Sequence, residues 1–482
     1  MLPPRPAPPA GAVLCFLLAA CSLGPDYTPP ELEIPAAYRA TAESAKEAWP
    51  SLDWWRGFGS ADLDALITEA EANSFDIAAA VARVRQADAQ VSIAGSALLP
   101  TVTASAKDNW NRAFVQRALG PGGHYTEGRL YTLGPAVSYE FDVWGRLRAT
   151  RDAAVASALF SRFDQQTVAI TAVAAVATTW FQALALQDRI DVAHRNLRDS
   201  EDILAAIQAR QDAGTASLLD VSQQGALVAG IRASIPGLQS QMEQQLVGLG
   251  ILTGHPPEAI TLRPGTLNTL SLPETPINLP SALLARRPDI ASAEAQLIAA
   301  NANIRVAHAD FFPQITLTGS GGWQNIALNT LFGPTSVFAN ALLTATQTIF
   351  DNGQLAGQLE QAKGRYDELL ADYRKAVVQA FTDVDDAAIA YRFATEQEKL
   401  QADAVRVAQQ AADIARAQVL AGTSDIVTAL QAQTTLFTDL DTLAQVRLSR
   451  FLALVNLYKA LGGGWAKSDV VSPAVTIYQG IL

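Results

Sequence analysis

Side chains able to carry out chemistry are few in this chain and do not gather into a catalytic pattern. The four histidines are His124, His194, His255 and His308. Their separations lack the short spacings of metal ligands, and no phosphate-binding glycine loop, nucleophile elbow or Cys-x-x-Cys pair occurs. The acidic cluster Asp383, Asp385 and Asp386 falls in a helical pattern, where we expect a solvated helix face. The sequence therefore predicts neither an enzyme nor a metal or cofactor site.

One cysteine does predict a covalent modification. Residues 1–20 carry one positive charge, Arg5, and then an apolar run that is too short to span a bilayer but suits a secretory signal. The run ends in Leu-Ala-Ala-Cys21, which resembles a bacterial lipobox. We expect Cys21 to carry an S-diacylglycerol and an N-acyl chain after cleavage; the alternative is an ordinary signal peptide with a chance cysteine. Because Ser22 rather than an aspartate follows, we expect export to the outer membrane.

Composition narrows the class of protein further. The net charge of −12 makes the chain a poor candidate for nucleic acid or for a polybasic membrane surface. The other cysteine, Cys15, would leave with the signal, so the mature chain has no disulfide. The chain is rich in alanine and only 7% aromatic, which favours long helices over several compact cores.

The chain contains an internal repeat. Five landmarks recur in the same order, offset by 208 to 213 residues: Asp76 with Asp289, Pro100 with Pro313, Asp142 with Asp351, Gly214 with Gly422, and Gly254 with Gly462. We therefore expect a lipid-anchored, proline-rich segment over 21–59, one repeat over 60–265, a second over 266–465 and a tail over 466–482.

Proline placement predicts one very long helix in each repeat. No proline lies between Pro135 and Pro236 or between Pro334 and Pro473, and proline costs ~3 kcal/mol inside a helix. Helices over Asp142–Ala213 and Asp351–Ala421 would each reach ~105 Å at about 1.5 Å per residue. The second also carries a coiled-coil stripe, formed by Tyr366, Leu370, Tyr373, Val377, Phe381, Val384 and Tyr391. A structure that crosses the periplasm needs this length; an ordinary coiled-coil scaffold is the alternative.

Two segments of alternating character precede each long helix. They are Thr101–Lys107, Tyr131–Val143, Ile315–Trp323 and Val337–Ile349, the last being the weakest because Phe338 and Leu342 fall on its polar face. Strands with one apolar and one polar face suit a membrane barrel, although a soluble antiparallel sheet is the alternative. Four strands cannot close a barrel in lipid, whereas three copies would supply twelve strands and a lumen.

One uncharged stretch could be scored as a membrane helix. Residues Thr167–Gln187 carry no charge, but they are dominated by Ala and Thr and lie inside the longer proline-free segment. We expect a tightly packed helix there.

Several motifs resemble one known family. They are Gly24 to Pro29 with Trp54, Trp55 and Phe58; Ser138 to Arg146; Leu283 to Ile290, continuing to Phe311-Phe312-Pro313; and Ala460 to Trp465. Over about residues 18 to 465 the chain resembles the TolC-like outer-membrane factors, in the branch that serves resistance-nodulation-division pumps. The resemblance implies a homotrimer with a twelve-stranded outer-membrane β-barrel and a periplasmic α-helical barrel. It also implies a periplasmic adaptor, an inner-membrane pump that supplies the energy, and no need for nucleotide or metal.

The resemblance also gives the repeated Ala-Gly-Thr elements a place. Glycine ends helices readily, so each element reads as the turn at the periplasmic tip, where the family receives its adaptor. The expected tip residues are Gly214, Thr215, Ser217, Asp220, Gly422, Thr423 and Asp425. Asp220 falls on a family gate acid. The second tip departs from the family pattern, with Ser424 in place of an arginine latch, Thr428 and Gln431 in place of an acidic ring, and Val419 in place of a gating tyrosine.

Together these features predict a mixed α/β membrane protein that acts as a passive outer-membrane exit duct for small toxic compounds or drugs. The alternatives are an exit duct for type I secretion and a structural lipoprotein that tethers the envelope. Alternating strands ahead of each helix favour a duct, because a tether does not need them.

Overall fold

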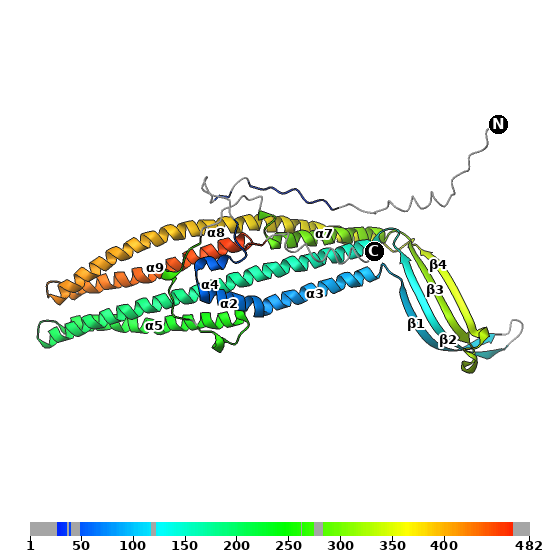
Figure 1. The fold of residues 1–482 in the computed structure, drawn as a ribbon, viewed down its shortest axis with the longest axis horizontal. Coiled ribbons are helices and arrows are strands. Elements are labelled where there is room, and N and C mark those ends of the chain that lie inside the picture. The colour runs from blue at the N-terminus through cyan, green and yellow to red at the C-terminus, as the bar shows by residue number, and fades with distance from the viewer. Residues whose placement is uncertain are drawn as a thin grey trace, which may run out of the picture. The chain divides into compact units, whose positions relative to one another are not determined.

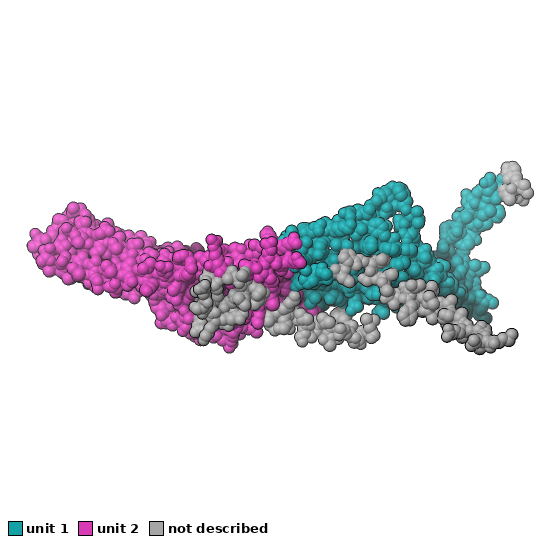
Figure 2. Space-filling model, turned by 90° about the horizontal axis from the view of Figure 1, so that it is seen from above, with its two compact units in different colours: residues 1–30, 85–160, 293–372 teal, residues 31–84, 161–292, 373–482 magenta. Residues whose placement is uncertain are grey.

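The computed structural model describes residues 27–35, 38–39, 49–116, 122–261, 263–273 and 283–465. The expected signal peptide, Cys21 and the tail over 466–482 lie outside these residues. The chain divides into two compact units, coloured separately in Figure 2. Unit 1 consists of residues 1–30, 85–160 and 293–372, and unit 2 of residues 31–84, 161–292 and 373–482. Each unit therefore draws on both halves of the chain.

Unit 1 contains a four-stranded antiparallel sheet. Its strands are β1 (Thr101–Gln116), β2 (Gly123–Phe141), β3 (Gln314–Asn325) and β4 (Val337–Thr346), in the order β1-β2-β3-β4 (Figure 1). All four predicted segments form strands, although β2 ends at Phe141 rather than Val143 and β4 at Thr346 rather than Ile349. β1 is longer than predicted because its ladder with β2 continues beyond the apolar alternation, through pairs such as Arg112 with Glu127.

The inner strand β2 contains a proline at the point where its pairing with β3 is interrupted. Pairing between β2 and β3 is interrupted between Leu133 and Ala136, and Pro135, which has no N–H to donate, lies in this interruption. A Cβ on Gly134 would lie 2.0 Å from the carbonyl oxygen of Gly321. Only glycine fits at position 134.

The two long helices are confirmed. α4 (Arg146–Asp212) and α8 (Gln354–Leu420) have 67 residues each, or ~100 Å at about 1.5 Å per residue. Within unit 1, α3 (Phe75–Ser96) packs on the start of α4 through Val91, Ala94, Ala154 and Ala158. α7 (Pro288–Ala309) is the corresponding helix of the second repeat.

Unit 2 contains the two helical hairpins, in which α4 turns into α5 (Leu218–Thr253) and α8 into α9 (Ile426–Ala460), as Figure 1 shows. Apolar clusters join Ile190 of α4 to Ile235 of α5, and Ala408 of α8 to Leu436 of α9. A third cluster near the turns joins α4, α8 and α9. The predicted stripe of α8 is buried at Tyr373, Val377, Phe381 and Val384.

The uncharged stretch of α4 is packed inside the protein, as predicted. α4 is long and apolar enough to cross a membrane by length and composition, but 56% of its apolar stretch is buried inside the protein. Phe181 is fully buried and packs against Phe58 and Phe451, with ring centroids 4.9 Å away in each case. Phe58 belongs to the short helix η1 (Trp54–Phe58), so the N-terminal aromatic motif caps this core. α2 (Ala61–Asn73) follows η1.

Candidate functional site

The sheet has one apolar and one polar face, and the strand registers keep the faces in phase across all four strands. Val102 pairs with Val137, Val137 with Gly319, and Gly319 with Ala341. The other apolar-face positions include Ala104, Ala106, Leu133, Tyr139, Phe141, Ile315, Leu317, Trp323, Val337, Leu343 and Ala345. Val102, Leu343 and Val337 are 67%, 64% and 66% exposed, so none of the residues that the structure describes covers these positions.

The opposite face presents small polar side chains. Thr101, Ser138 and Thr318 stand in one row across three strands, and the next rows add residues such as Thr103, Ser105, Thr316, Ser320 and Thr344. Phe338 and Leu342 lie on this face, as the sequence predicted. A sheet with this contrast separates an apolar medium from water.

The apolar band of β2 has the height of a bilayer core. From Phe141 to Tyr131 the strand rises ~33 Å, or ~25 Å along the membrane normal at the usual tilt of about 40°. Aromatic residues mark both ends of this band, with Tyr139 and Phe141 at one end and Tyr131 and Trp323 at the other. Aromatic girdles at this separation are typical of strands that cross an outer membrane.

Ion pairs lie directly beyond the end of the band that Tyr131 marks. Arg129 on β2 forms a bidentate pair with Asp108 on β1, with N–O distances of 2.9 and 2.5 Å. Arg112 pairs with Glu127 at 3.3 Å. Charged side chains on the apolar face thus begin where the band of bilayer height ends.

Each junction between sheet and long helix uses the same capping chemistry. The Asp142 carboxylate accepts the backbone N–H groups of Leu147 and Arg148 at 2.9 and 3.0 Å. Asp351 accepts those of Gly353 and Leu355 at 3.0 and 2.8 Å, and these hydrogen bonds hold the pKa of Asp351 below its usual value. Both helices therefore begin a few residues later than predicted, because each Asp caps its helix instead of entering it.

The first hairpin tip is built by the residues that the sequence singled out. Gly214 has φ 76° and ends α4, and Thr215 closes the turn by donating from its N–H to the Arg210 carbonyl at 2.8 Å. Ser217 and Asp220 form a reciprocal capping box that starts α5, with hydrogen bonds of 2.9 and 3.2 Å. Asp220 thus has a structural role at the start of the returning helix.

The second tip repeats the first. Gly422 has φ 74°, and the Thr423 N–H donates to the Gln418 carbonyl at 2.9 Å. Asp425 starts α9 by accepting the N–H of Thr428 at 2.8 Å, and this contact lowers the pKa of Asp425. Val419, at the position of the family's gating tyrosine, is buried. The exposed Gly214, Thr215, Ser217, Gly422, Thr423 and Asp425, together with Asp220, lie in the two helical turns, and their role in docking an adaptor stays a prediction.

An arginine that the sequence analysis missed links the two tips. Arg210, in the last turn of α4, donates from Nη1 to the carbonyl oxygen of Val419 at 2.7 Å and from Nη2 to that of Thr215 at 3.5 Å. Arg210, which belongs to the first hairpin, therefore supplies a hydrogen-bond donor to a backbone carbonyl at the C-terminal end of α8 in the second hairpin. The sequence signal that could have identified Arg210 is its position as a basic residue in the last turn of a helix.

A buried arginine joins three other helices of unit 2. Arg287 donates to Asp289 on α7 at 3.0 and 2.6 Å, to Asp383 on α8 at 2.9 Å, and to the Ala460 carbonyl of α9 at 3.2 Å. Burial alone would lower its pKa, but the two carboxylates outweigh burial and raise the pKa. Asp383 is therefore an ion-pair partner of Arg287, although its side chain is still 35% exposed. Asp386 is exposed, as the predicted solvated face requires.

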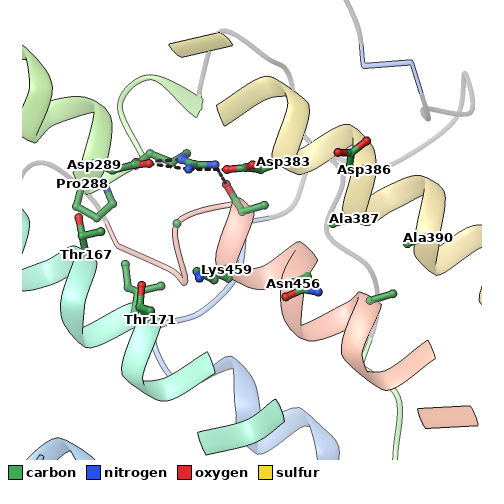
Figure 3. Close-up of a pocket in the computed structure, with 15 residues that line it drawn as sticks. Thr167, Thr171, Pro288, Asp289, Asp383, Asp386, Ala387, Ala390, Asn456 and Lys459 are labelled. Carbon is green, nitrogen blue, oxygen red and sulfur yellow. Dashed lines mark hydrogen bonds and ion pairs between the residues drawn. The ribbon is translucent and has the colours of Figure 1, made fainter. Parts of the chain in front are cut away.

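A cavity of about 440 Å³ lies beside this arginine. Figure 3 shows Asp289 and Asp383 along one side and Thr171, Asn456 and Lys459 along the other. Among the residues that the structure describes, no group of three His, Cys, Asp or Glu side chains is placed to hold a metal ion.

Comparisons with known proteins agree with this geometry. The family model described as "Outer membrane efflux protein" matches residues 66–255 and 279–463. The chain is 37% identical over 460 residues to the pyoverdine export outer membrane protein OpmQ of Pseudomonas aeruginosa, covering 94% of this chain and 95% of the relative. It is 33% identical over 463 residues to the probable efflux pump outer membrane protein TtgC of Pseudomonas putida, with coverage of 94% and 95%.

Solved structures match over nearly the whole chain. The outer-membrane channel OprN superposes with a TM-score of 0.85 at 27% identity, covering 92% of this chain and 100% of that one. The open state of the Neisseria gonorrhoeae MtrE outer membrane channel gives a TM-score of 0.82 at 28% identity, with coverage of 92% and 98%. These matches confirm the resemblance drawn from the sequence motifs. The chain therefore belongs to the outer membrane efflux protein family and is an outer-membrane exit duct.

Proposed function

We propose that three copies of this chain close into one twelve-stranded barrel, which continues as a helical tunnel through the periplasm. The observation that carries the proposal is the open four-stranded sheet with one face apolar over the height of a bilayer. An open sheet edge leaves backbone N–H and C=O groups without partners in lipid, so β1 and β4 need strands from other copies. Two copies would give eight strands and a filled interior, whereas three leave a lumen.

The hairpin tips fit a protein partner. Four large apolar side chains around them, Leu218, Leu219, Leu420 and Val427, are each at least half exposed, and clustered exposed apolar groups favour a protein interface. We assign this surface, with the tip glycines and Asp220, to a periplasmic adaptor. The adaptor would connect the duct to an inner-membrane pump of the resistance-nodulation-division class, which supplies the energy.

The exported compounds are proposed only as a class, small toxic molecules. The names of similar proteins include pyoverdine export, toluene efflux and antibiotic efflux. Substrates this different favour a duct that does not select strongly. The proposal also includes a lipid anchor on Cys21, which would hold the start of the mature chain at the outer membrane.

The test is planar-bilayer conductance of the purified, lipidated protein, with its oligomeric mass measured in parallel. We expect a trimer that opens discrete channels. A monomer or dimer without conductance would contradict the duct and favour an envelope tether. A trimer that stays closed is tested again as Arg210→Ala, which removes the link between the tips; absence of channels in that trimer would also contradict the duct.

A further inference from the structure

The strands β1 and β2 continue beyond the rest of the sheet as a two-stranded ribbon. Pairing between β2 and β3 reaches only to Tyr131, whereas β1 and β2 stay paired as far as Gln116 with Gly123. The long helix α4 follows the other end of β2, so the ribbon lies on the side of the membrane away from the helices. A hairpin of two strands is at best marginally stable in water. A partner along one face would therefore stabilise the ribbon.

The two faces of the ribbon differ sharply. One face, which we call the ribbon face, consists only of aromatic and charged residues, in the cross-strand pairs Asp108 with Tyr131, Trp110 with Arg129, Arg112 with Glu127, and Phe114 with Tyr125. The opposite face is mostly small or polar, with Lys107, Asn109, Asn111, Ala113, Val115, His124, Thr126, Gly128, Leu130 and Thr132. Trp110, Phe114 and Tyr125 are each more than half exposed. Among the residues that the structure describes, none covers these rings.

The ribbon face continues the apolar band on the same side of the sheet. Ala106 with Leu133 is the last apolar pair of the band, and the next pair on this side, Asp108 with Tyr131, begins the ribbon face. The band faces the hydrocarbon of the outer membrane. What meets the ribbon face is therefore the layer directly outside that hydrocarbon, which is the headgroup layer of the outer leaflet.

The ribbon face is taller than a phospholipid headgroup. From Tyr131 to Tyr125 the strand rises ~20 Å, or ~15 Å along the membrane normal at a tilt of about 40°. Headgroups add only ~5–8 Å to each side of the hydrocarbon core of an ordinary bilayer. Phospholipid headgroups would therefore cover Tyr131 and Trp110 but leave Phe114 and Tyr125 in water. A lipid with a taller headgroup, built from sugars, would cover the whole face.

The charged side chains of the ribbon face cancel one another. Arg129 pairs with Asp108 at 2.9 and 2.5 Å, and Arg112 pairs with Glu127 at 3.3 Å. Two positive and two negative groups leave the face without formal charge, so it does not attract anionic headgroups through a long-range field. Guanidinium groups donate to hydroxyl groups and carboxylates accept from them. The charged pairs therefore suit a polar ligand that carries many hydroxyl groups.

Each arginine of the ribbon face also stacks on a tyrosine. The guanidinium carbon of Arg112 lies 4.5 Å from the centre of the Tyr125 ring, and that of Arg129 lies 5.1 Å from the centre of the Tyr131 ring. Stacking and ion pairing together hold each planar group in one orientation. The ion pairs use only some of the five N–H donors of each guanidinium. Exposed aromatic rings beside such donors offer an apolar surface for the C–H side of a sugar ring.

We infer that the ribbon face binds the saccharide headgroup of a glycolipid in the outer leaflet of the outer membrane. The sugar rings would pack on Trp110, Phe114 and Tyr125, and their hydroxyl groups would bond to the charged pairs between these rings. Lipopolysaccharide is a glycolipid of this class and serves as the probe. The inference rests on the proposed contact of the apolar band with lipid, and it concerns only the part of the strands outside the hydrocarbon.

Binding of lipopolysaccharide to the purified trimer in detergent tests the inference. Lipopolysaccharide should bind at least about tenfold more tightly than phosphatidylglycerol, an anionic lipid without sugars. Phe114→Ser should weaken the binding of lipopolysaccharide about tenfold, because it removes one packing ring. Val115→Ser changes the next residue, on the opposite face, and should alter the affinity by less than about twofold. Equal effects of these two changes would overturn the inference.

A second pair of variants separates hydrogen bonding from simple charge attraction. Arg129→Gln and Lys107→Gln each remove one positive charge, but from opposite faces of the ribbon. Only Arg129→Gln should weaken the binding of lipopolysaccharide, by about tenfold or more, as expected for hydrogen bonds to charged groups. If both variants lost the same affinity, binding would follow net charge and the sugar site would be wrong.

A measurement on the unchanged chain does not depend on how the variants fold. Lipopolysaccharide should slow amide hydrogen exchange between Lys107 and Gln116 and between Gly123 and Tyr131, because a bound headgroup stabilises the ribbon. Phosphatidylglycerol should not slow it. Equal protection by the two lipids, or association of trimers with one another through the ribbon that lipopolysaccharide does not dissociate, would overturn the inference.

The outcomes separate this inference from the proposed function. A conducting trimer that binds lipopolysaccharide no better than phosphatidylglycerol overturns the sugar site while the duct stands. A chain that is monomeric or does not conduct contradicts the duct itself, whichever lipid it binds.

Discussion

An arginine on one face of β2 should be far more harmful than an arginine at the next residue. Val137 lies on the apolar face midway between Leu133 and Phe141, ~13 Å along the strand from each. Arginine facing lipid at the middle of the bilayer costs ~2–4 kcal/mol, so Val137→Arg should lower the folding equilibrium about 30- to 900-fold. Ser138 lies on the polar face in a row with Thr101 and Thr318. Ser138→Arg should therefore fold almost as well as the unchanged chain.

The assay is folding into lipid vesicles, followed by urea titration and by the shift in gel mobility between heated and unheated samples. Tyr131→Arg serves as a depth control, because at the edge of the band the cost should fall to ~0–1 kcal/mol. Ser138→Arg would place an arginine in the lumen, so this variant should change the ion selectivity of the channel instead of its folding. If Ser138→Arg were as destabilising as Val137→Arg, or if Val137→Arg folded normally, the assignment of the apolar face to lipid would be refuted.

Four further predictions follow from the helices and the anchor. Replacing Arg287 alone with Met should cost ~1–3 kcal/mol, because it leaves the Ala460 carbonyl and the half-buried carboxylates of Asp289 and Asp383 without their donor. Adding Asp383→Asn should recover part of this loss in urea unfolding, and no recovery would contradict the ion pair. Arg210→Ala should raise channel opening without changing trimer mass, and unchanged gating in single-channel recordings would refute the link. The pKa of Asp425 is lowered in the folded protein, so the stabilisation of α9 by this cap should persist down to about pH 4 and be lost as pH falls further. Amide hydrogen exchange at the second tip should show this loss of stability, and Asp425→Asn should abolish the pH dependence. Cys21→Ala should remove metabolic labelling with palmitate, and retained label would exclude this residue as the anchor.

Local chemistry explains why much of the molecule could be predicted. Proline-free stretches predicted the long helices, because one proline inside a helix costs ~3 kcal/mol of stability. Glycine followed by threonine identified both turns, since positive φ and the closing N–H are properties of those few residues. The rule that proline ends a helix has an exception at Pro236, which lies inside α5. There, packing of Ile235 and Leu238 against α4 holds the helix together despite the proline.

Contacts between distant residues could not be predicted in this way. Nothing near Arg210 in the sequence indicates that its partner is the Val419 carbonyl, 209 residues away. The sequence predicted a solvated acidic face for Asp383, and only the fold shows that this side chain also pairs with Arg287. In both cases the partner is chosen by how the helices pack, and helical periodicity describes only one helix at a time.

The sequence by itself determined the elements of this protein: two long helices, two glycine turns and four strands with one apolar face each. Those features depend on residues a few positions apart, so backbone geometry and side-chain alternation are sufficient to specify them. Only the tertiary structure decided that the four apolar faces align in one band, because register depends on pairing between strands. It also decided that Arg210 of α4 donates to the last turn of α8, since that contact exists only where the two hairpin tips meet.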